Sequence, residues 1–216
     1  MINEKTLFIL GAGASCPYKY PTGKELRRLI YEEFPYRYGK LSEKINSSEV
    51  GISRSVIQDD IQLAPKFADN FFKSSTPSID LFLARNPNFS NIGKKAIALS
   101  IWLAESKSCF RENVDQNQDW YSYLYQRMTE TLTEPDSYEQ INQNKISFIT
   151  FNYDRSLQFF LYESLTNSFN LGYTAHHPYS NLLPFSIQHV YGQLCKRSIN
   201  PTCLNMAKHE IFGVVL

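Results

Sequence analysis

Two short apolar runs, each ended abruptly by small or polar residues, constrain the fold of this chain more than any other feature. The first run is TLFIL at residues 6–10, and the sequence GAGAS follows it at once. The second run is ISFITF at residues 146–151, and Asn152, Tyr153 and Asp154 follow it. Apolar runs of this length that end at turn residues are typical of strands in a parallel sheet. We therefore predict a buried parallel strand at both places.

Helical patterns alternate with these strands. Thr22 and Glu25 have the spacing of a capping box, which predicts a helix start near residue 22. The polar stretch 36–76 predicts one or two short helices. Further helices are predicted within residues 76–86, 91–110, 119–132 and 155–165. Short strands are predicted within residues 187–194 and 210–216. This alternation predicts an α/β fold with a Rossmann-like open parallel sheet and a helical insertion.

Polar or small residues follow the strands at three points. They are Gly11–Ser15, Asn152–Asp154, and His189 with Gly192 close behind it. In open parallel sheets, ligands bind beyond the carboxyl ends of the strands. We therefore expect these three segments to meet at one edge of the sheet and to form the functional site.

The GAGAS segment can be interpreted in two ways. Gly11 and Gly13 allow the backbone conformations and the close approach that a bound diphosphate needs, and Ser15 adds a hydroxyl. The alternative is a tight turn between a strand and a helix, without a ligand. The segment is not a GxGxxG motif, because Cys16 occupies the third glycine position, and Lys24 lies too far along for a P-loop.

The other two strand ends also have structural alternatives. Asn152 and Asp154 lie two residues apart, so in an extended chain their side chains point the same way. Asp154 could instead satisfy the first amides of the following helix. His189 could be a hydrogen-bonded core residue rather than a catalytic one.

Composition gives no indication of nucleic-acid binding, membrane insertion or metal binding. Lys and Arg number 22 and Asp and Glu 21, a net charge of +1, which gives no indication of nucleic-acid or membrane binding. We recognise neither a secretory leader nor an apolar run long enough to span a membrane. The four cysteines form no CxxC pair, and His176 and His177 lack supporting ligands, so we predict no metal site. The simplest expectation is a cytoplasmic protein with reduced thiols.

Three motifs in this order resemble the signatures of the sirtuin fold. GAGAS at 11–15 resembles Gly-Ala-Gly-x-Ser, TFNYD at 150–154 resembles Thr-x-Asn-x-Asp, and HVYG at 189–192 resembles His-x-x-Gly. Three further segments resemble connecting motifs of the bacterial sirtuin-like NAD-cleaving domains of anti-phage defence systems. They are SIDLFL at 78–83, IGKKAI at 92–97 and DWYSYL at 119–124.

The resemblance implies one sirtuin-like NAD-binding domain over residues 1–216, with a helical excursion at about 36–135. It implies hydrolysis of NAD to nicotinamide and ADP-ribose, with Asn152 holding the ribose and the attacking water and His189 acting as general base. NAD is then a substrate, and no metal is needed. The residues implied in binding NAD are Gly11, Ala12, Gly13, Ser15, Thr150 and Asp154.

Departures from the family pattern leave other functions open. PYKYPTGKEL at 17–26 replaces the Pro-Asp-Phe-Arg segment of the protein-deacylating sirtuins, and paired zinc-ribbon cysteines are missing, so deacylation of acyl-lysine is disfavoured. Few residues follow His189, so we expect a truncated product or one segment of a larger system. The main alternative is a catalytically silent module of a multi-subunit system, which binds NAD or ADP-ribose or serves as a scaffold. Either function implies a regulatory protein partner or a homo-oligomer.

Overall fold

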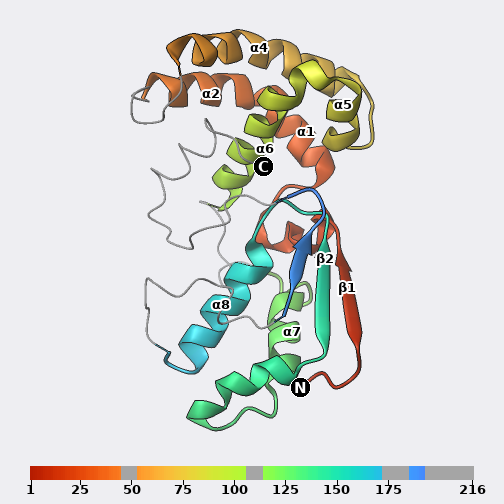
Figure 1. Cartoon of the computed structure of the whole chain (residues 1–216), viewed down its shortest axis with the longest axis vertical. Coiled ribbons are helices and arrows are strands. Elements are labelled where there is room, and N and C mark those ends of the chain that lie inside the picture. The colour runs from red at the N-terminus through yellow and green to blue at the C-terminus, as the bar shows by residue number, and fades with distance from the viewer. Residues whose placement is uncertain (45–52, 106–113, 172–184, 193–216) are drawn as a thin grey trace. The chain divides into compact units, whose positions relative to one another are not determined.

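A computed structural model describes most of the chain (Figure 1). The described residues are 1–44, 53–105, 114–171 and 185–192. The chain divides into two compact units. The first comprises residues 1–20 and 108–200, and the second comprises residues 21–107 and 201–216.

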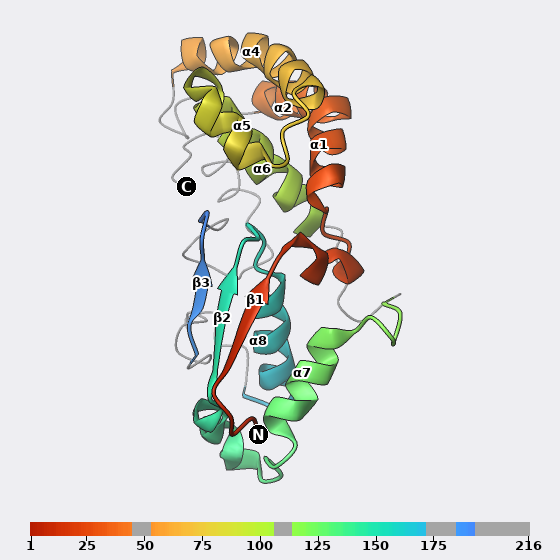
Figure 2. The same ribbon diagram turned by 90° about the vertical axis from the view of Figure 1, so that its right-hand side faces the viewer.

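Within the described residues, a three-stranded parallel sheet organises the first unit (Figure 2). Its strands are β1 (Thr6–Leu10), β2 (Ile146–Thr150) and β3 (Ile187–His189), in the spatial order β1-β2-β3. Leu10 pairs with Thr150, and Thr150 pairs with His189. The prediction of three parallel neighbouring strands is confirmed, and the chain is a mixed α/β protein.

The predicted full burial of the first two strands is wrong. Side chains alternate between the two faces of a sheet, and only one face is covered by the described residues. Phe8 stacks on Phe148 at a ring distance of 5.1 Å on the covered face. Leu7 and Ile9 lie on the other face, where Ile9 remains 66% exposed. The strands are therefore half-buried, as in a sheet with helices on one side.

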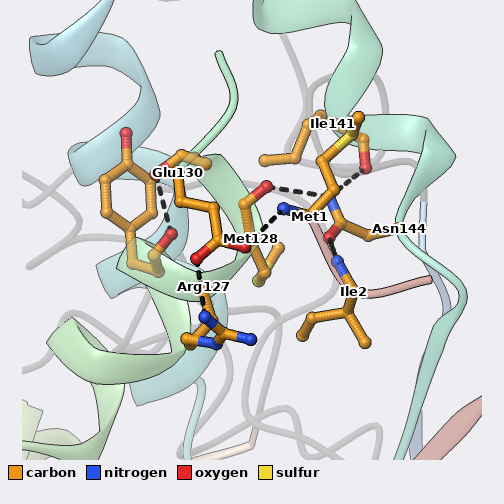
Figure 3. Close-up of polar contacts among 9 residues, drawn as sticks. Met1, Ile2, Arg127, Met128, Glu130, Ile141 and Asn144 are labelled. Atoms are coloured by element: carbon orange, nitrogen blue, oxygen red, sulfur yellow. Dashed lines mark hydrogen bonds and ion pairs between the residues drawn. The ribbon is translucent and has the colours of Figure 1, made fainter. Parts of the chain in front are cut away.

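Buried Asn144 ties together the starts of β1 and β2 (Figure 3). Its Oδ1 accepts a hydrogen bond from Ile2 N at 2.8 Å. Its Nδ2 donates to the carbonyl oxygens of Met128 and Ile141 at 3.1 and 2.9 Å. Lys145 N also donates to Ile2 O at 3.0 Å. These bonds fix where the chain enters both strands, and hence the pairing register.

The helices described in the first unit lie on one side of the sheet (Figures 1 and 2). They are α7 (Trp120–Thr129) and α8 (Ser156–Ser168), and a 3₁₀ helix, η4 (Pro135–Gln143), precedes β2. Tyr18 stacks on Tyr121 with a ring distance of 3.9 Å, and Phe160 of α8 lies against both rings. This aromatic core joins the start of the chain to α7 and α8.

The described residues of the second unit form helices. They are α1 (Gly23–Glu32), α2 (Phe34–Glu43), α4 (Arg54–Lys73), α5 (Ile79–Arg85), η3 (Pro87–Phe89) and α6 (Ser90–Glu105). The capping box of Thr22 and Glu25 is confirmed, and Ser78 caps α5. The expectation of only short helices at 36–76 is wrong, because α4 runs for 20 residues through Pro65. Its buried Phe67 and Phe71 supply the packing that maintains it.

A buried ion pair lies inside the helical unit. Lys95 of α6 is 2% exposed, and its Nζ lies 2.5 Å from Asp60 Oδ2 of α4. Tyr38 of α2 donates a hydrogen bond to the same oxygen at 3.0 Å. These contacts link three helices through the carboxylate of Asp60. Burial and the nearby Asp60 raise the pKa of Tyr38 well above its usual value.

None of the helices within the described residues is long and apolar enough to cross a bilayer.

Some predicted segments cannot be compared with the structure. The end of the helix predicted at 91–110 and the strand predicted at 210–216 lie outside the described residues.

Candidate functional site

The three segments predicted to form the site meet at one edge of the sheet. They are Gly11–Ser15, Asn152–Asp154, and His189 with Gly192. Because the strands are parallel, their carboxyl ends point the same way (Figure 2). The pairing of Leu10, Thr150 and His189 brings the residues after β1 and β2 level with the end of β3. The predicted convergence of these strand ends is confirmed. All the residues of the candidate site belong to the first unit.

Ser15 connects the first strand end to the second. Its side chain is 1% exposed, and its Oγ donates to Asp154 Oδ2 at 2.8 Å. Ser15 Oγ also accepts a hydrogen bond from Asn152 Nδ2 at 3.3 Å. Asn152 and Asp154 are both buried. As expected from their spacing, their side chains point the same way, and both contact the Ser15 hydroxyl.

Both carboxylate oxygens of Asp154 are occupied within the protein. Oδ2 accepts from Ser15, and Oδ1 accepts from Ser156 N at 3.1 Å and from Ser156 Oγ at 2.5 Å. The hydroxyl of Tyr121 lies 2.6 Å from Ser156 Oγ. Burial and the negative charge of Asp154 raise the pKa of Tyr121 well above its usual value. Asp154 therefore supports the start of α8 and also the glycine-rich loop after β1, residues 11–18.

Asn152 combines a fixed backbone with an unpaired side-chain oxygen. Its N–H donates to the buried Thr150 Oγ1 at 3.0 Å, which fixes the turn after β2. Its Oδ1 is buried and has no hydrogen-bond partner among the described residues. A buried acceptor without a partner costs roughly 1–3 kcal/mol. Such an atom is a reason to look for a bound ligand or water at that point.

His189 is held at both ring nitrogens. Nδ1 lies 2.9 Å from Asn152 O, and Nε2 lies 2.6 Å from the amide nitrogen of Gln158. Burial is the main influence on the pKa of His189 and lowers it below the usual 6.5, with Arg155 acting in the same direction. The hydrogen bond to Asn152 and the charge of Asp154 oppose this shift. The net shift favours the neutral form of the ring near pH 7.

The glycine-rich loop leaves space beside its backbone. It contains two 3₁₀ turns, η1 (Ala12–Ala14) and η2 (Cys16–Tyr18). Gly11 has φ −108°, an extended conformation open to any residue, so the backbone at this position does not itself require glycine in this structure. A Cβ at Gly11 or Gly13 would meet no atom of the described residues within 4 Å. The remaining advantage of glycine at both positions is the close approach that it allows from outside.

Residues that the sequence prediction did not single out hold this loop in position. Trp120 Nε1 donates to Ala14 O at 2.7 Å. Tyr18 OH donates to Asp119 Oδ1 at 2.9 Å and accepts from Tyr121 N at 2.8 Å. These contacts connect the loop to the beginning of α7. The resemblance of DWYSYL to a family motif was the signal that could have identified them.

No group of three or more potential metal ligands occurs among the residues that the structure describes. Cys16 is a free, exposed thiol beside the loop. Cys195 and Cys203 lie outside the described ranges, as do His176 and His177.

Comparisons with known proteins returned no match to a family model, a curated protein or a solved structure.

Proposed function

We propose that this chain is a sirtuin-like NAD hydrolase that cleaves the bond between nicotinamide and ribose. The observation that carries the proposal is the linked group at the ends of the three parallel strands. The carboxamide of Asn152 donates to the Ser15 hydroxyl, and the imidazole of His189 bonds to the backbone oxygen of Asn152, so the three residues form one hydrogen-bonded set. The three motifs behind the sirtuin resemblance are the ones that supply these groups.

Two features suit a dinucleotide at this edge. The Asn152 Oδ1 acceptor is buried and unpaired within the described part of the chain, so a ribose hydroxyl or a water could donate to it. The open space beside Gly11 and Gly13 suits a diphosphate that must come close to the backbone. Ala12, between the two glycines, keeps this surface small. Thr150 and Asp154 act here by fixing Asn152 and Ser15.

The proposed reaction needs little acid catalysis. The nicotinamide ring is cationic in NAD and leaves as a neutral base, taking the electron pair of the broken C–N bond. Water forms the new bond to the ribose carbon, and His189 accepts the proton that the water releases. A neutral histidine suits this task near pH 7. Asn152 would orient the water and the ribose without adding charge.

The biological part of the proposal follows from the family resemblance. We place the enzyme in the cytoplasm, where it would deplete NAD in anti-phage defence. Because unrestrained hydrolysis of NAD would harm the cell, we propose control by a regulatory protein partner or by homo-oligomerisation.

The test is to incubate the purified protein with NAD and to identify the products by chromatography. We expect nicotinamide and ADP-ribose. Asn152→Ala should bind NAD and release little nicotinamide. Gly13→Val should lose both binding and turnover, because the added side chain would fill the space where the diphosphate approaches. Gly39→Val is the matched control, since Gly39 lies in α2 and also has open space at its Cβ.

Two outcomes would redirect the proposal. Binding of NAD or ADP-ribose without cleavage would favour the catalytically silent module. Unchanged NAD affinity in Gly13→Val would show that the glycine-rich loop is only a turn.

A further inference from the structure

Gln158, a residue outside all the motifs considered above, contacts the proposed base directly. It lies on α8, four residues after Asp154. Its side-chain Nε2 is 2.6 Å from His189 Nε2, on the opposite side of the ring from Nδ1, which faces Asn152 O at 2.9 Å. Both ring nitrogens of His189 therefore have a protein partner.

The two partners determine where the ring proton lies. A backbone carbonyl oxygen can only accept a hydrogen bond, so His189 Nδ1 must carry a hydrogen. The amide nitrogen of Gln158 can only donate, so His189 Nε2 must present its lone pair. A doubly protonated ring would set an N–H group of His189 against an N–H group of Gln158 and would require the amide to turn over and present Oε1. The pair of contacts thus selects the neutral ring with its hydrogen on Nδ1.

We infer that Gln158 is a positioning residue that fixes His189 in this tautomer and makes Nε2 the atom that accepts a proton. The proton-accepting role rests on the proposed function, whereas the tautomer can be measured without it. Because Gln158 occupies the lone pair, a water or a ribose hydroxyl that reaches Nε2 must take over its hydrogen bond. Gln158 would then act in the reaction only through His189.

The charged groups near the His189 ring influence its pKa and have to be considered in a test. Asp154 favours the protonated ring, while Arg155 and burial favour the neutral one. A carboxylate in place of the Gln158 amide would reverse the local preference, because it can only accept a hydrogen bond. Gln158→Glu keeps the shape of the side chain and should therefore preserve the fold.

The first measurement uses the unmodified protein. Nitrogen-15 NMR of the imidazole rings distinguishes the two tautomers and follows the pKa of each histidine. The chain has four histidines, and the spectrum of His189→Ala assigns the signal of interest. We expect a protonated Nδ1, an unprotonated Nε2 and a pKa below 6.5 for His189. A hydrogen on Nε2 in the neutral ring would overturn the inference.

The second measurement uses Gln158→Glu. An adjacent opposite charge should raise the pKa of His189 by roughly 1 to 3. Gln188→Glu is the matched control, because it adds the same charge beside His189 on β3 at an exposed position. The pKa change there should be much smaller, since water screens the charge. Equal changes in the two variants, or none in Gln158→Glu, would overturn the inference.

Turnover of NAD provides the third measurement and separates the two proposals. The acidic limb of the rate profile should move to higher pH in Gln158→Glu, by the amount that NMR finds for the pKa of His189. If the pKa moves and the acidic limb does not, His189 Nε2 is not the proton acceptor and the inference fails. If the unmodified protein never cleaves NAD, the proposed function fails, and the tautomer and pKa measurements alone decide whether Gln158 fixes the ring.

Discussion

Ser15→Ala should be one of the most damaging small changes in the sheet-containing unit. The substitution removes one oxygen, but that oxygen serves two buried partners. Asp154 Oδ2 loses its 2.8 Å donor, and Asn152 Nδ2 loses its acceptor. A hydrogen bond to a charged group contributes about 1.5–3 kcal/mol and a neutral one about 1 kcal/mol. We therefore expect a loss of about 2.5–4 kcal/mol in the free energy of unfolding.

The assay is thermal or denaturant unfolding of the purified variant. A loss of this size corresponds to a fall in Tm of about 5–16 °C for a chain of this length. Ser122→Ala is the matched control, because Ser122 Oγ also donates to a carboxylate, that of Asp119, at 2.5 Å. Ser122 is only half-buried, so water can replace its bond and the loss should stay below about 1 kcal/mol. Equal losses in the two variants would refute the argument from burial.

Three further predictions concern stability. Lys95→Met should cost about 3–5 kcal/mol because it leaves the buried Asp60 uncompensated, whereas Lys73→Met breaks an exposed pair and should cost less than about 1 kcal/mol. Equal effects in unfolding experiments would contradict this difference. Thr166→Val should be neutral or stabilising by about 1 kcal/mol, because Thr166 Oγ1 is buried without a partner among the described residues; a clear fall in Tm would argue otherwise. Because the pKa of His189 is lowered in the folded protein, its contribution to stability should be present above pH 6.5 and decline as the pH falls below it. Unfolding of the parent and of His189→Ala across pH 5–8 should show this difference, and parallel profiles would contradict it.

The strand ends could be predicted from the sequence because parallel topology leaves little choice. Once residues 6–10, 146–150 and 187–189 are neighbouring parallel strands, the residues that follow them must share one edge. Two local helix starts were also predictable, because the hydrogen bonds of Thr22 and Ser78 involve residues only a few positions away.

Burial and long-range side-chain contacts could not be predicted in the same way. The apolar sequence of β1 suggested burial on both faces, yet Leu7 and Ile9 lie on a face that the described residues leave open. Gln158 reaches His189 only because α8 returns beside β3, a contact across 31 positions that no local pattern encodes. Asn144 could not be predicted for the same reason, because its partner Ile2 lies 142 positions away in the sequence.

The length of α4 could not be predicted from the composition of residues 36–76. A polar stretch with an internal Pro65 gave no reason to expect the 20-residue α4. Its apolar positions are spaced to bury Phe67 and Phe71 against Phe82 and Phe89. Packing of these rings outweighs the local cost of the proline, which is a tertiary effect.

The most direct test of the central claim is the rate of nicotinamide release from NAD by the parent protein and by His189→Ala, at equal occupancy of NAD. The account predicts release by the parent and a fall of about 10²–10⁴-fold in the variant, the usual effect of losing a general base, with NAD binding retained. Cleavage by His189→Ala at the parental rate would contradict the assignment of His189. The absence of cleavage by a parent protein that binds NAD would contradict the proposed hydrolase itself.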